Sequence, residues 1–126
     1  MSIFGIGIDT IEIKRFKELL HKYSLKIPLK ILSTLELKEF MKKKKKSSFL
    51  AKRFTAKEAC MKALGIGFTY PNILKNLEIF NNRKGKPKIR ILKKKIHKIF
   101  QKKTYKIHLS ITDTKKYAQS IVLLEY

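Results

Sequence analysis

The apolar residues at the start of the chain predict a strand followed directly by a helix. The first apolar run, at residues 2–8, has the composition of a strand, and Gly5 and Gly7 indicate that another backbone passes close to it. Asp9 ends this run. From Ile13 onwards, apolar residues recur with the period of a helix. They are Ile13, Phe16, Leu20 and Tyr23.

The next segment predicts a break and then a short helix. Pro28 is expected to interrupt the chain, because it cannot donate a backbone hydrogen bond. Ser33 and Glu36 have the spacing of a capping box, which predicts a helix over residues 35–41. Five consecutive lysines at residues 42–46 repel one another, so they are expected in a solvated loop or helix end.

A longer helix is predicted over residues 49–64. Ser47 or Ser48 is the expected cap, and Gly65 and Gly67 follow its end. Its apolar stripe consists of Leu50, Phe54, Met61 and Leu64.

The second half of the chain is mostly strand-like. Four strands are predicted, at residues 77–81, 86–92, 105–112 and 117–125. A turn at residues 82–85 joins the first two, and an amphipathic helix at residues 93–103 precedes the last two. This order predicts one α+β domain over residues 1–126, with a mostly antiparallel sheet packed against a long central helix.

Composition sets further bounds. A chain of 126 residues with 44% hydrophobic content can bury a core. It contains no apolar run long enough to span a membrane and no basic leader before its first apolar run, so we expect a cytosolic protein. Cys60 is the only cysteine, which excludes an internal disulfide and a cysteine-rich zinc site.

The formal net charge of +22 favours an anionic partner: nucleic acid, an anionic membrane, or an acidic protein or cofactor. Only four of the 31 basic residues are arginine, the side chain on which nucleic-acid readers most depend. The abundance of lysine, isoleucine and asparagine is also typical of an A/T-rich coding sequence, which alone would explain many lysines. The charge therefore indicates an anionic partner without selecting nucleic acid.

Asp9 and Glu58 are notable because the chain has only nine acidic residues. Asp9 could equally be a turn residue or the cap of the first helix. Glu58 precedes Lys62 by four residues, which is the favourable orientation for an exposed helix pair. However, two carboxylates from separate elements could bind magnesium if the fold brought them together, with phosphate oxygens and water completing the shell.

Other candidates for chemistry are weaker. His108 and Ser110 fall on one face of a predicted strand, but no acid completes a catalytic triad. Cys60 has no neighbouring histidine and is expected to be packed. The glycine pairs in the first strand and after the long helix complete neither a dinucleotide fingerprint nor a phosphate-binding loop.

Three segments together resemble the holo-acyl-carrier-protein synthases, the small bacterial 4′-phosphopantetheinyl transferases. Residues 5–15 are similar to the family's G-x-x-x-D segment, which has an arginine six residues after the aspartate. Residues 49–67 resemble F-x-x-[KR]-E-A-x-x-K-A-x-G. Residues 80–91 and 107–113 resemble the N-x-x-G-K-P segment and the terminal H-x-S strand. The three segments occur in the order and spacing of the family, and the alignment extends over essentially the whole chain.

The resemblance implies a function. The family transfers the 4′-phosphopantetheine arm of coenzyme A to a serine of apo-acyl carrier protein, releases 3′,5′-ADP and supports fatty acid biosynthesis. It implies a homotrimer that binds coenzyme A between neighbouring subunits. Asp9 and Glu58 match the family's Mg²⁺ ligands, and Lys62 matches a lysine near the transferred phosphate. We expect Glu58, or a water that it holds, to accept the serine proton.

Further matches concern coenzyme A and the carrier protein. Arg53 matches a residue that contacts a phosphate of the nucleotide. The segment lining the adenine pocket corresponds to Gly85, Lys86 and Pro87, and the strand near the pyrophosphate contains His108 and Ser110. Arg15 matches the basic first helix on which the acidic carrier protein docks. Asp113 departs from the family pattern, which often has a second histidine there.

Two other classes of protein remain open. A non-enzymatic basic module that binds RNA or the ribosome fits the charge and small size, although arginine is scarce and no RNA-binding signature is present. A synthase that has lost its activity is also conceivable, but Asp9, Glu58 and Lys62 are intact.

Overall fold

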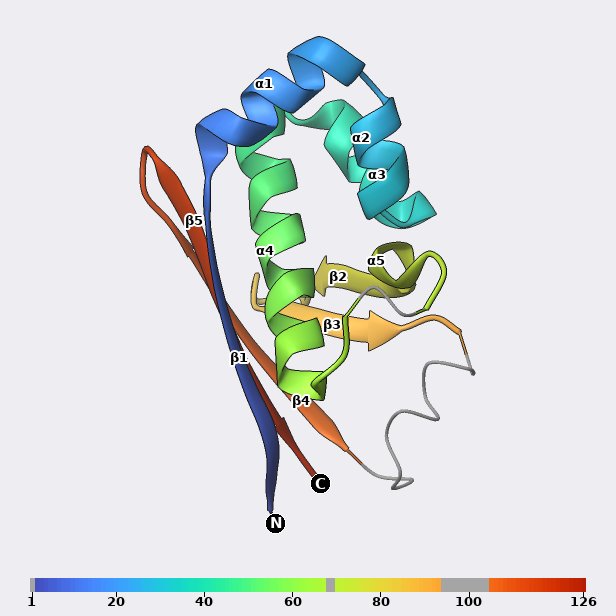
Figure 1. The fold of residues 1–126 in the computed structure, drawn as a ribbon, viewed down its shortest axis with the longest axis vertical. Helices are drawn as coiled ribbons and strands as arrows, with labels where there is room; N and C mark the ends of the chain where they lie inside the picture. Colours follow the sequence, from blue (N-terminus) through green and yellow to red (C-terminus); the bar gives the residue numbers. More distant parts are fainter. Residues whose placement is uncertain (1, 68–69, 94–104) are drawn as a thin grey trace.

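A computed structural model describes residues 2–67, 70–93 and 105–126, and it confirms the predicted α+β fold. Its main sheet is antiparallel, with strand order β1-β5-β4 (Figure 1). The strands are β1 (Ile3–Glu12), β5 (Tyr117–Glu125) and β4 (Lys106–Asp113). Helix α4 (Lys46–Leu64) crosses one face of the sheet, over β1 and β5.

Gly5 and Gly7 allow β1 to lie against α4. A Cβ at Gly5 would lie 1.9 Å from the Ala63 carbonyl oxygen, and one at Gly7 would lie 1.9 Å from that of Ala59. Real side chains do not approach backbone this closely, so only glycine fits at either position. The predicted close approach of another backbone is confirmed.

The strand that contains Asp9 is longer than predicted. β1 continues to Glu12, because Asp9 still pairs in register with Ser120 of β5. The prediction that Asp9 ends the strand is therefore wrong. The prediction of a helix cap is also wrong, because Glu12 occupies the cap position of the first helix.

Three helices connect β1 to α4: α1 (Ile13–Tyr23), α2 (Lys26–Ile31) and α3 (Thr34–Lys42). The predicted capping box is present, because Ser33 and Glu36 exchange their hydrogen bonds at the start of α3. Pro28 does not break the chain. It is the third residue of α2, where a backbone N–H would have no partner within the helix.

Helix α4 is buried on most of its surface. Twelve of its 19 residues are buried, because it lies between the sheet and the other helices. The predicted stripe was too narrow for such an environment, and it included Phe54, which is only partly buried. The predicted caps Ser47 and Ser48 lie inside the helix, whose cap is Lys45.

A smaller sheet completes the fold. It pairs β2 (Leu77–Asn81) with β3 (Pro87–Ile91), after the short helix α5 (Ile73–Asn76). Gly85 has a φ of 83° in the intervening turn, which glycine adopts readily. Residues 94–103 of the predicted amphipathic helix lie outside the described residues.

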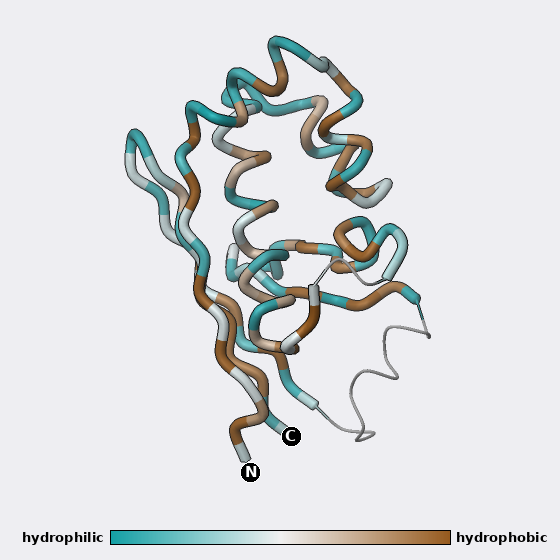
Figure 2. The backbone as a smooth tube through the Cα atoms, in the orientation of Figure 1, coloured by the Kyte–Doolittle hydropathy of each residue, from teal (hydrophilic) through white to brown (hydrophobic). Residues whose placement is uncertain are grey.

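The distribution of apolar residues matches this packing. The end of the main sheet nearest the two termini is hydrophobic, whereas the turn between β4 and β5 is hydrophilic (Figure 2). Ser2 and Tyr126 exchange backbone hydrogen bonds at the hydrophobic end. Of the described helices, none is both long and apolar enough to span a membrane.

Candidate functional site

Asp9 faces α4 and is held there by two of its residues. Its Oδ2 lies 2.8 Å from the Thr55 hydroxyl, which also lies 2.9 Å from the Asp9 carbonyl oxygen. Its Oδ1 lies 3.2 Å from the Lys62 ammonium, which also donates to the Ile8 carbonyl at 3.1 Å. The carboxylate is therefore fixed on the helix side of β1.

Glu58 lies close enough to Asp9 for their charges to interact. Burial raises the pKa of the Glu58 carboxyl, and the negative charge of Asp9 raises it further, while Lys62 acts in the opposite direction. The ammonium of Lys62 pairs with Asp9. The interpretation of Glu58 and Lys62 as an ordinary surface pair is therefore replaced by a cluster of three charged groups from two elements.

This cluster has the composition of a partial cation site. The two carboxylates repel each other, and a bound cation would relieve that repulsion. In the described part of the chain, no group of three or more His, Cys, Asp or Glu side chains is placed to hold a metal ion. Two carboxylates that leave most of the coordination shell to water and phosphate oxygens suit Mg²⁺.

Arg53 lines a second site, a pocket of about 240 Å³ between α3, α4 and β3. Its guanidinium is buried, lies 4.8 Å from the centre of the Phe49 ring, and is 3.1 Å from Glu39. Pro87 lines the same pocket. The structure thus brings together Arg53 and Pro87, two residues that the sequence assigned to one nucleotide.

Gly85 and Lys86, the other residues of that segment, are exposed in the turn before β3. They do not line the pocket beside Pro87.

His108 and Ser110 lie on the face of the sheet that points away from α4. Across the strands, Asp9 aligns with the buried Ser120, whereas Ser110 aligns with the exposed Ile121. His108 is half-exposed, and its Nε2 lies 2.7 Å from Glu125. Within one chain, His108 and Ser110 are therefore not brought together with Asp9.

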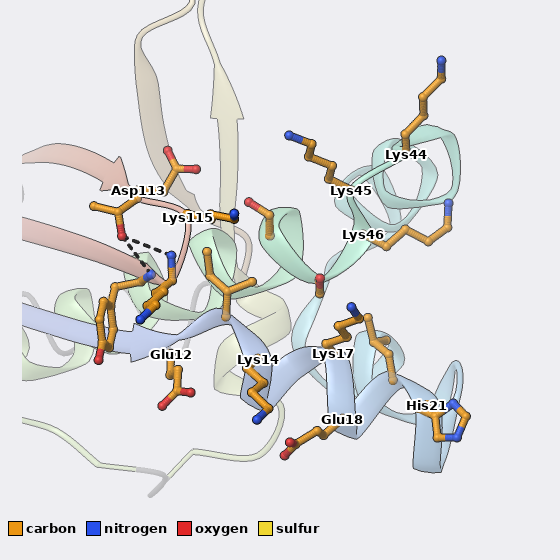
Figure 3. A pocket seen from close by; sticks show the side chains of 17 residues that line it. Glu12, Lys14, Lys17, Glu18, His21, Lys44, Lys45, Lys46, Asp113 and Lys115 are labelled. Atoms are coloured by element: carbon orange, nitrogen blue, oxygen red, sulfur yellow. Dashed lines mark hydrogen bonds between the residues drawn. The ribbon is translucent and has the colours of Figure 1, made fainter.

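An open basic cleft of about 1680 Å³ lies beside α1 (Figure 3). Residues 44–48 and the turn at residues 113–117 form its other walls. Seven lysines and three acidic residues line it, so its net charge per residue is close to that of the whole chain. Charge alone therefore does not distinguish this cleft from the rest of the surface.

Cys60 is completely buried, and burial raises the pKa of its thiol to about 12. It is therefore protonated and inaccessible at neutral pH, which confirms the expectation that it is packed rather than nucleophilic.

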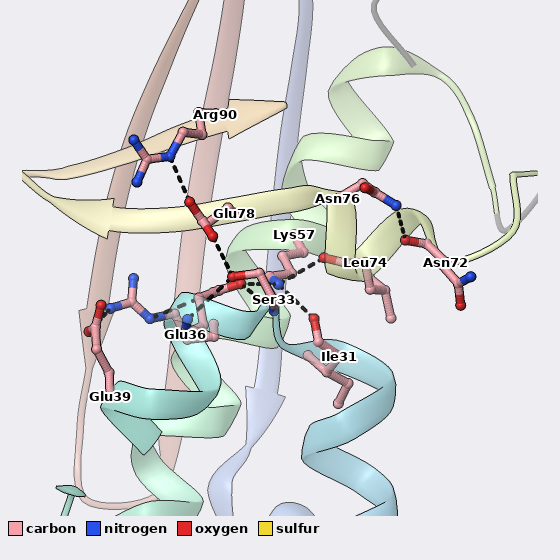
Figure 4. A network of polar contacts seen from close by, with 11 residues as sticks. Ile31, Ser33, Glu36, Glu39, Lys57, Asn72, Leu74, Asn76, Glu78 and Arg90 are labelled. Carbon is pink, nitrogen blue, oxygen red and sulfur yellow. Dashed lines mark hydrogen bonds and ion pairs between the residues drawn. The ribbon is translucent and has the colours of Figure 1, made fainter. Parts of the chain in front are cut away.

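Two features of the site were not predicted from the sequence. Thr55 positions Asp9, and only its place in a helix beside β1 could have indicated this. Lys57 is completely buried and bonded to Glu36, in a polar network that links α3, α4 and β2 (Figure 4). Its position directly before Glu58, in the segment that resembles the family signature, was the only signal.

Comparison with known proteins gives consistent matches. A model of the 4′-phosphopantetheinyl transferase superfamily matches residues 5–122. The holo-[acyl-carrier-protein] synthase of Buchnera aphidicola subsp. Acyrthosiphon pisum (strain Tuc7) is 47% identical over 125 residues, covering 99% of each chain.

Solved structures agree. The holo-[acyl-carrier-protein] synthase from Neisseria meningitidis has a TM-score of 0.90 and 32% identity, covering 99% of this chain and 100% of that one. The holo-(acyl-carrier-protein) synthase from Bacillus anthracis, solved in complex with CoA (3′,5′-ADP), has a TM-score of 0.78 and 32% identity, covering 99% of this chain and 98% of that one. The chain therefore belongs to the 4′-phosphopantetheinyl transferase superfamily.

Proposed function

We propose that this protein transfers the 4′-phosphopantetheine arm of coenzyme A to a serine of apo-acyl carrier protein, as a cytosolic enzyme of fatty acid biosynthesis. The observation that carries the proposal is the meeting of Asp9, Glu58 and Lys62 across β1 and α4. Family membership supports the reaction, and the charge cluster supports a magnesium ion held by Asp9 and Glu58.

The chain's own residues have defined tasks in this reaction. The serine oxygen bonds to the β-phosphorus of coenzyme A, and the bond from that phosphorus to 3′,5′-ADP breaks. Glu58, or a water that it holds, takes the serine proton; its raised pKa brings it closer to the operating pH. The Lys62 ammonium offsets charge on the phosphoryl oxygens. When bound, Mg²⁺ would supply Lewis-acid stabilisation of the diphosphate.

In this proposal, two copies of the chain contribute to one site. Asp9 lies on β1, one edge strand of the main sheet, and the Arg53 pocket is lined in part by Ile111 and Asp113 of β4, the other edge strand. Helix α4 lies over the sheet (Figure 1). His108 and Ser110 are on the opposite face. One coenzyme A can reach all of these groups if the β1 edge of one copy meets the β4 edge of the next, as in a closed homotrimer.

Apolar residues on the outer face of the sheet support this assembly. Ile6 is 62% exposed and Ile8 is 53% exposed, and Ile121 lies beside Ile8 on the next strand. Burial of such residues against a second copy would be favourable.

We place the acidic carrier protein on α1. Arg15 is exposed on this helix, with Lys14 and Lys17 beside it. We expect Arg15→Glu to raise the KM for the carrier at low salt, because steering between opposite charges is weakened. An unchanged carrier KM would contradict docking on α1.

The test is to incubate the protein with an apo-carrier protein, coenzyme A and Mg²⁺, and to measure the intact mass of the carrier. We expect the mass to increase by one phosphopantetheine arm, and we expect Asp9→Asn to lower the initial rate by about 100-fold or more, because losing even an outer-shell partner of a metal ligand typically costs about 10- to 100-fold. A carrier of unchanged mass would overturn the proposal.

A further inference from the structure

Arg53 is paired with two carboxylates that differ in burial, because the Glu36 side chain is fully buried and the Glu39 side chain is 36% exposed. Glu36 Oε2 lies 3.9 Å from Arg53 Nε, and Glu39 Oε2 lies 3.1 Å from Arg53 Nη2. Both acids are on α3, one turn apart. What differs is how firmly the rest of the protein holds each of them.

Glu36 is held by several polar contacts (Figure 4). It is fully buried, and its Oε1 accepts hydrogen bonds from the Lys57 ammonium at 2.6 Å and from the Ser33 backbone N–H at 3.1 Å. Lys57 is itself fixed by the carbonyl oxygens of Ile31 and Leu74, at 2.6 and 2.8 Å. The positive charge of Lys57 therefore compensates Glu36, whose second oxygen accepts no hydrogen bond from any residue that the structure describes.

Among the described residues, Arg53 alone makes a polar contact with the Glu39 side chain. That side chain is 36% exposed. It also lines the pocket of about 240 Å³. Breaking this contact would return the carboxylate to water at little cost, whereas moving Glu36 would leave the buried charge of Lys57 unpaired.

We propose that Glu39 is a displaceable counter-ion of Arg53: a phosphate of the bound nucleotide takes the place of Glu39 on the guanidinium. Glu36, fixed by Lys57, keeps Arg53 in position during the exchange. This inference rests on the proposed function, because it takes the phosphate from coenzyme A or its product.

The exchange is chemically reasonable. A phosphate group and a carboxylate both accept hydrogen bonds from a guanidinium in the same planar geometry. The face of Arg53 over Phe49 also limits the directions from which either acceptor can approach. In this way the Arg53 guanidinium keeps a carboxylate partner while the pocket is empty.

The test uses 3′,5′-ADP and isothermal titration calorimetry. We expect Glu39→Gln to bind 3′,5′-ADP about 3- to 5-fold more tightly than the wild type, because the partly exposed ion pair between Glu39 and Arg53 no longer has to be broken. With coenzyme A as substrate, the KM should fall by a similar factor while kcat stays unchanged. Glu18→Gln, which removes the same charge from α1, should leave 3′,5′-ADP affinity within 2-fold, because salt screens distant charges.

A double-mutant cycle with Arg53→Met separates displacement from a general change in charge. If Glu39 acts through Arg53, Glu39→Gln should bring no gain in affinity when Arg53→Met is already present. Equal or weaker 3′,5′-ADP binding by Glu39→Gln alone, or a gain that persists without Arg53, would overturn the displacement. If the wild type still modified the carrier, the proposed function would stand; a wild type that neither bound 3′,5′-ADP nor modified the carrier would overturn both.

Discussion

Lys57 and Glu58 are neighbours on α4, but their side chains lie in two regions that differ in exposure to solvent. The Lys57 ammonium lies 2.6 Å from the Glu36 carboxylate of α3, and both side chains are fully buried. Glu58 belongs with Lys62 and Asp9 beside β1, where the Lys62 side chain is 54% exposed and its distance to Asp9 is 3.2 Å. The first region is closed to solvent and the second is open to ligands.

The pKa values of the two regions show what the difference means. Burial lowers the pKa of Lys57 to about 8, and Glu36 opposes this fall. Burial raises the pKa of Glu58, and the nearby Asp9 increases the rise. In the first region the protein supplies the opposite charge itself. In the second it places two like charges together, so a cation must come largely from outside.

The largest expected effect tests the closed region. Lys57→Met should lower the free energy of unfolding by about 3–5 kcal/mol, because the buried Glu36 carboxylate loses its partner at 2.6 Å and keeps only the more distant guanidinium of Arg53, at 3.9 Å, among the described residues. Lys62→Met, the matched change in the open region, should cost at most about 1 kcal/mol, because its pair is exposed. Urea unfolding followed by circular dichroism measures both.

The comparison would fail if the two lysine variants were equally stable. A second variant guards against a different explanation, the loss of packing around Lys57. Adding Glu36→Gln to Lys57→Met should recover part of the lost stability, because it removes the buried carboxylate that has lost its closest partner. No recovery would mean that packing, rather than charge, sets the cost.

A smaller effect is expected where β1 meets α4. Gly7→Ala should cost about 1–3 kcal/mol, because the new Cβ would overlap the Ala59 carbonyl oxygen and push β1 away. Transfer activity should fall as well, because Asp9 moves with β1 away from Lys62. Gly67→Ala is the control: outside its chain neighbours, no described residue has an atom within 4 Å of the added Cβ, so stability and activity should stay near those of the wild type.

Equal stability of Gly7→Ala and Gly67→Ala would show that β1 can shift without cost. In that case the strand would not be what fixes Asp9. Thermal unfolding and the initial rate of carrier modification together distinguish these outcomes.

Local patterns predicted much of the fold. The capping box at Ser33, the glycine end of α4 and the turn at Gly85 were all set by neighbouring residues, so the sequence was enough to find them. The bounds around Asp9 and Pro28 were mistaken for a different reason. Pairing with β5 extends β1, and tertiary packing supports α2, and neither contact is visible in a local window.

The residues of the candidate site likewise fall into those that the sequence predicted and those that it did not. Asp9, Glu58 and Lys62 were selected from the sequence by resemblance. Spacing alone favoured an ordinary surface pair for Glu58 and left the role of Asp9 open. The buried partner of Lys57 could not be predicted, because Glu36 lies 21 residues away and reaches it only when α3 packs against α4. A lysine inside a helix is ordinarily assigned to solvent.

The smallest effect concerns the charge of Glu58 in the metal-free protein. Asp9→Asn should lower the pKa of Glu58 towards its ordinary value of 4.5 without reaching it, because burial, the larger cause, remains. Lys62→Met should raise the same pKa further, because the opposing positive charge is lost. In the wild type, the folded protein holds this proton more tightly than the unfolded chain. Ionisation of Glu58 therefore costs stability as pH rises through the raised pKa, and this cost should be smaller in Asp9→Asn and larger in Lys62→Met.

Carboxyl ¹³C NMR titration of the three proteins measures the pKa directly. Shifts of the same sign in both variants would mean that Glu58 senses the two side chains through a change of structure rather than through their charges, and the open region would no longer be a cluster of three interacting charges.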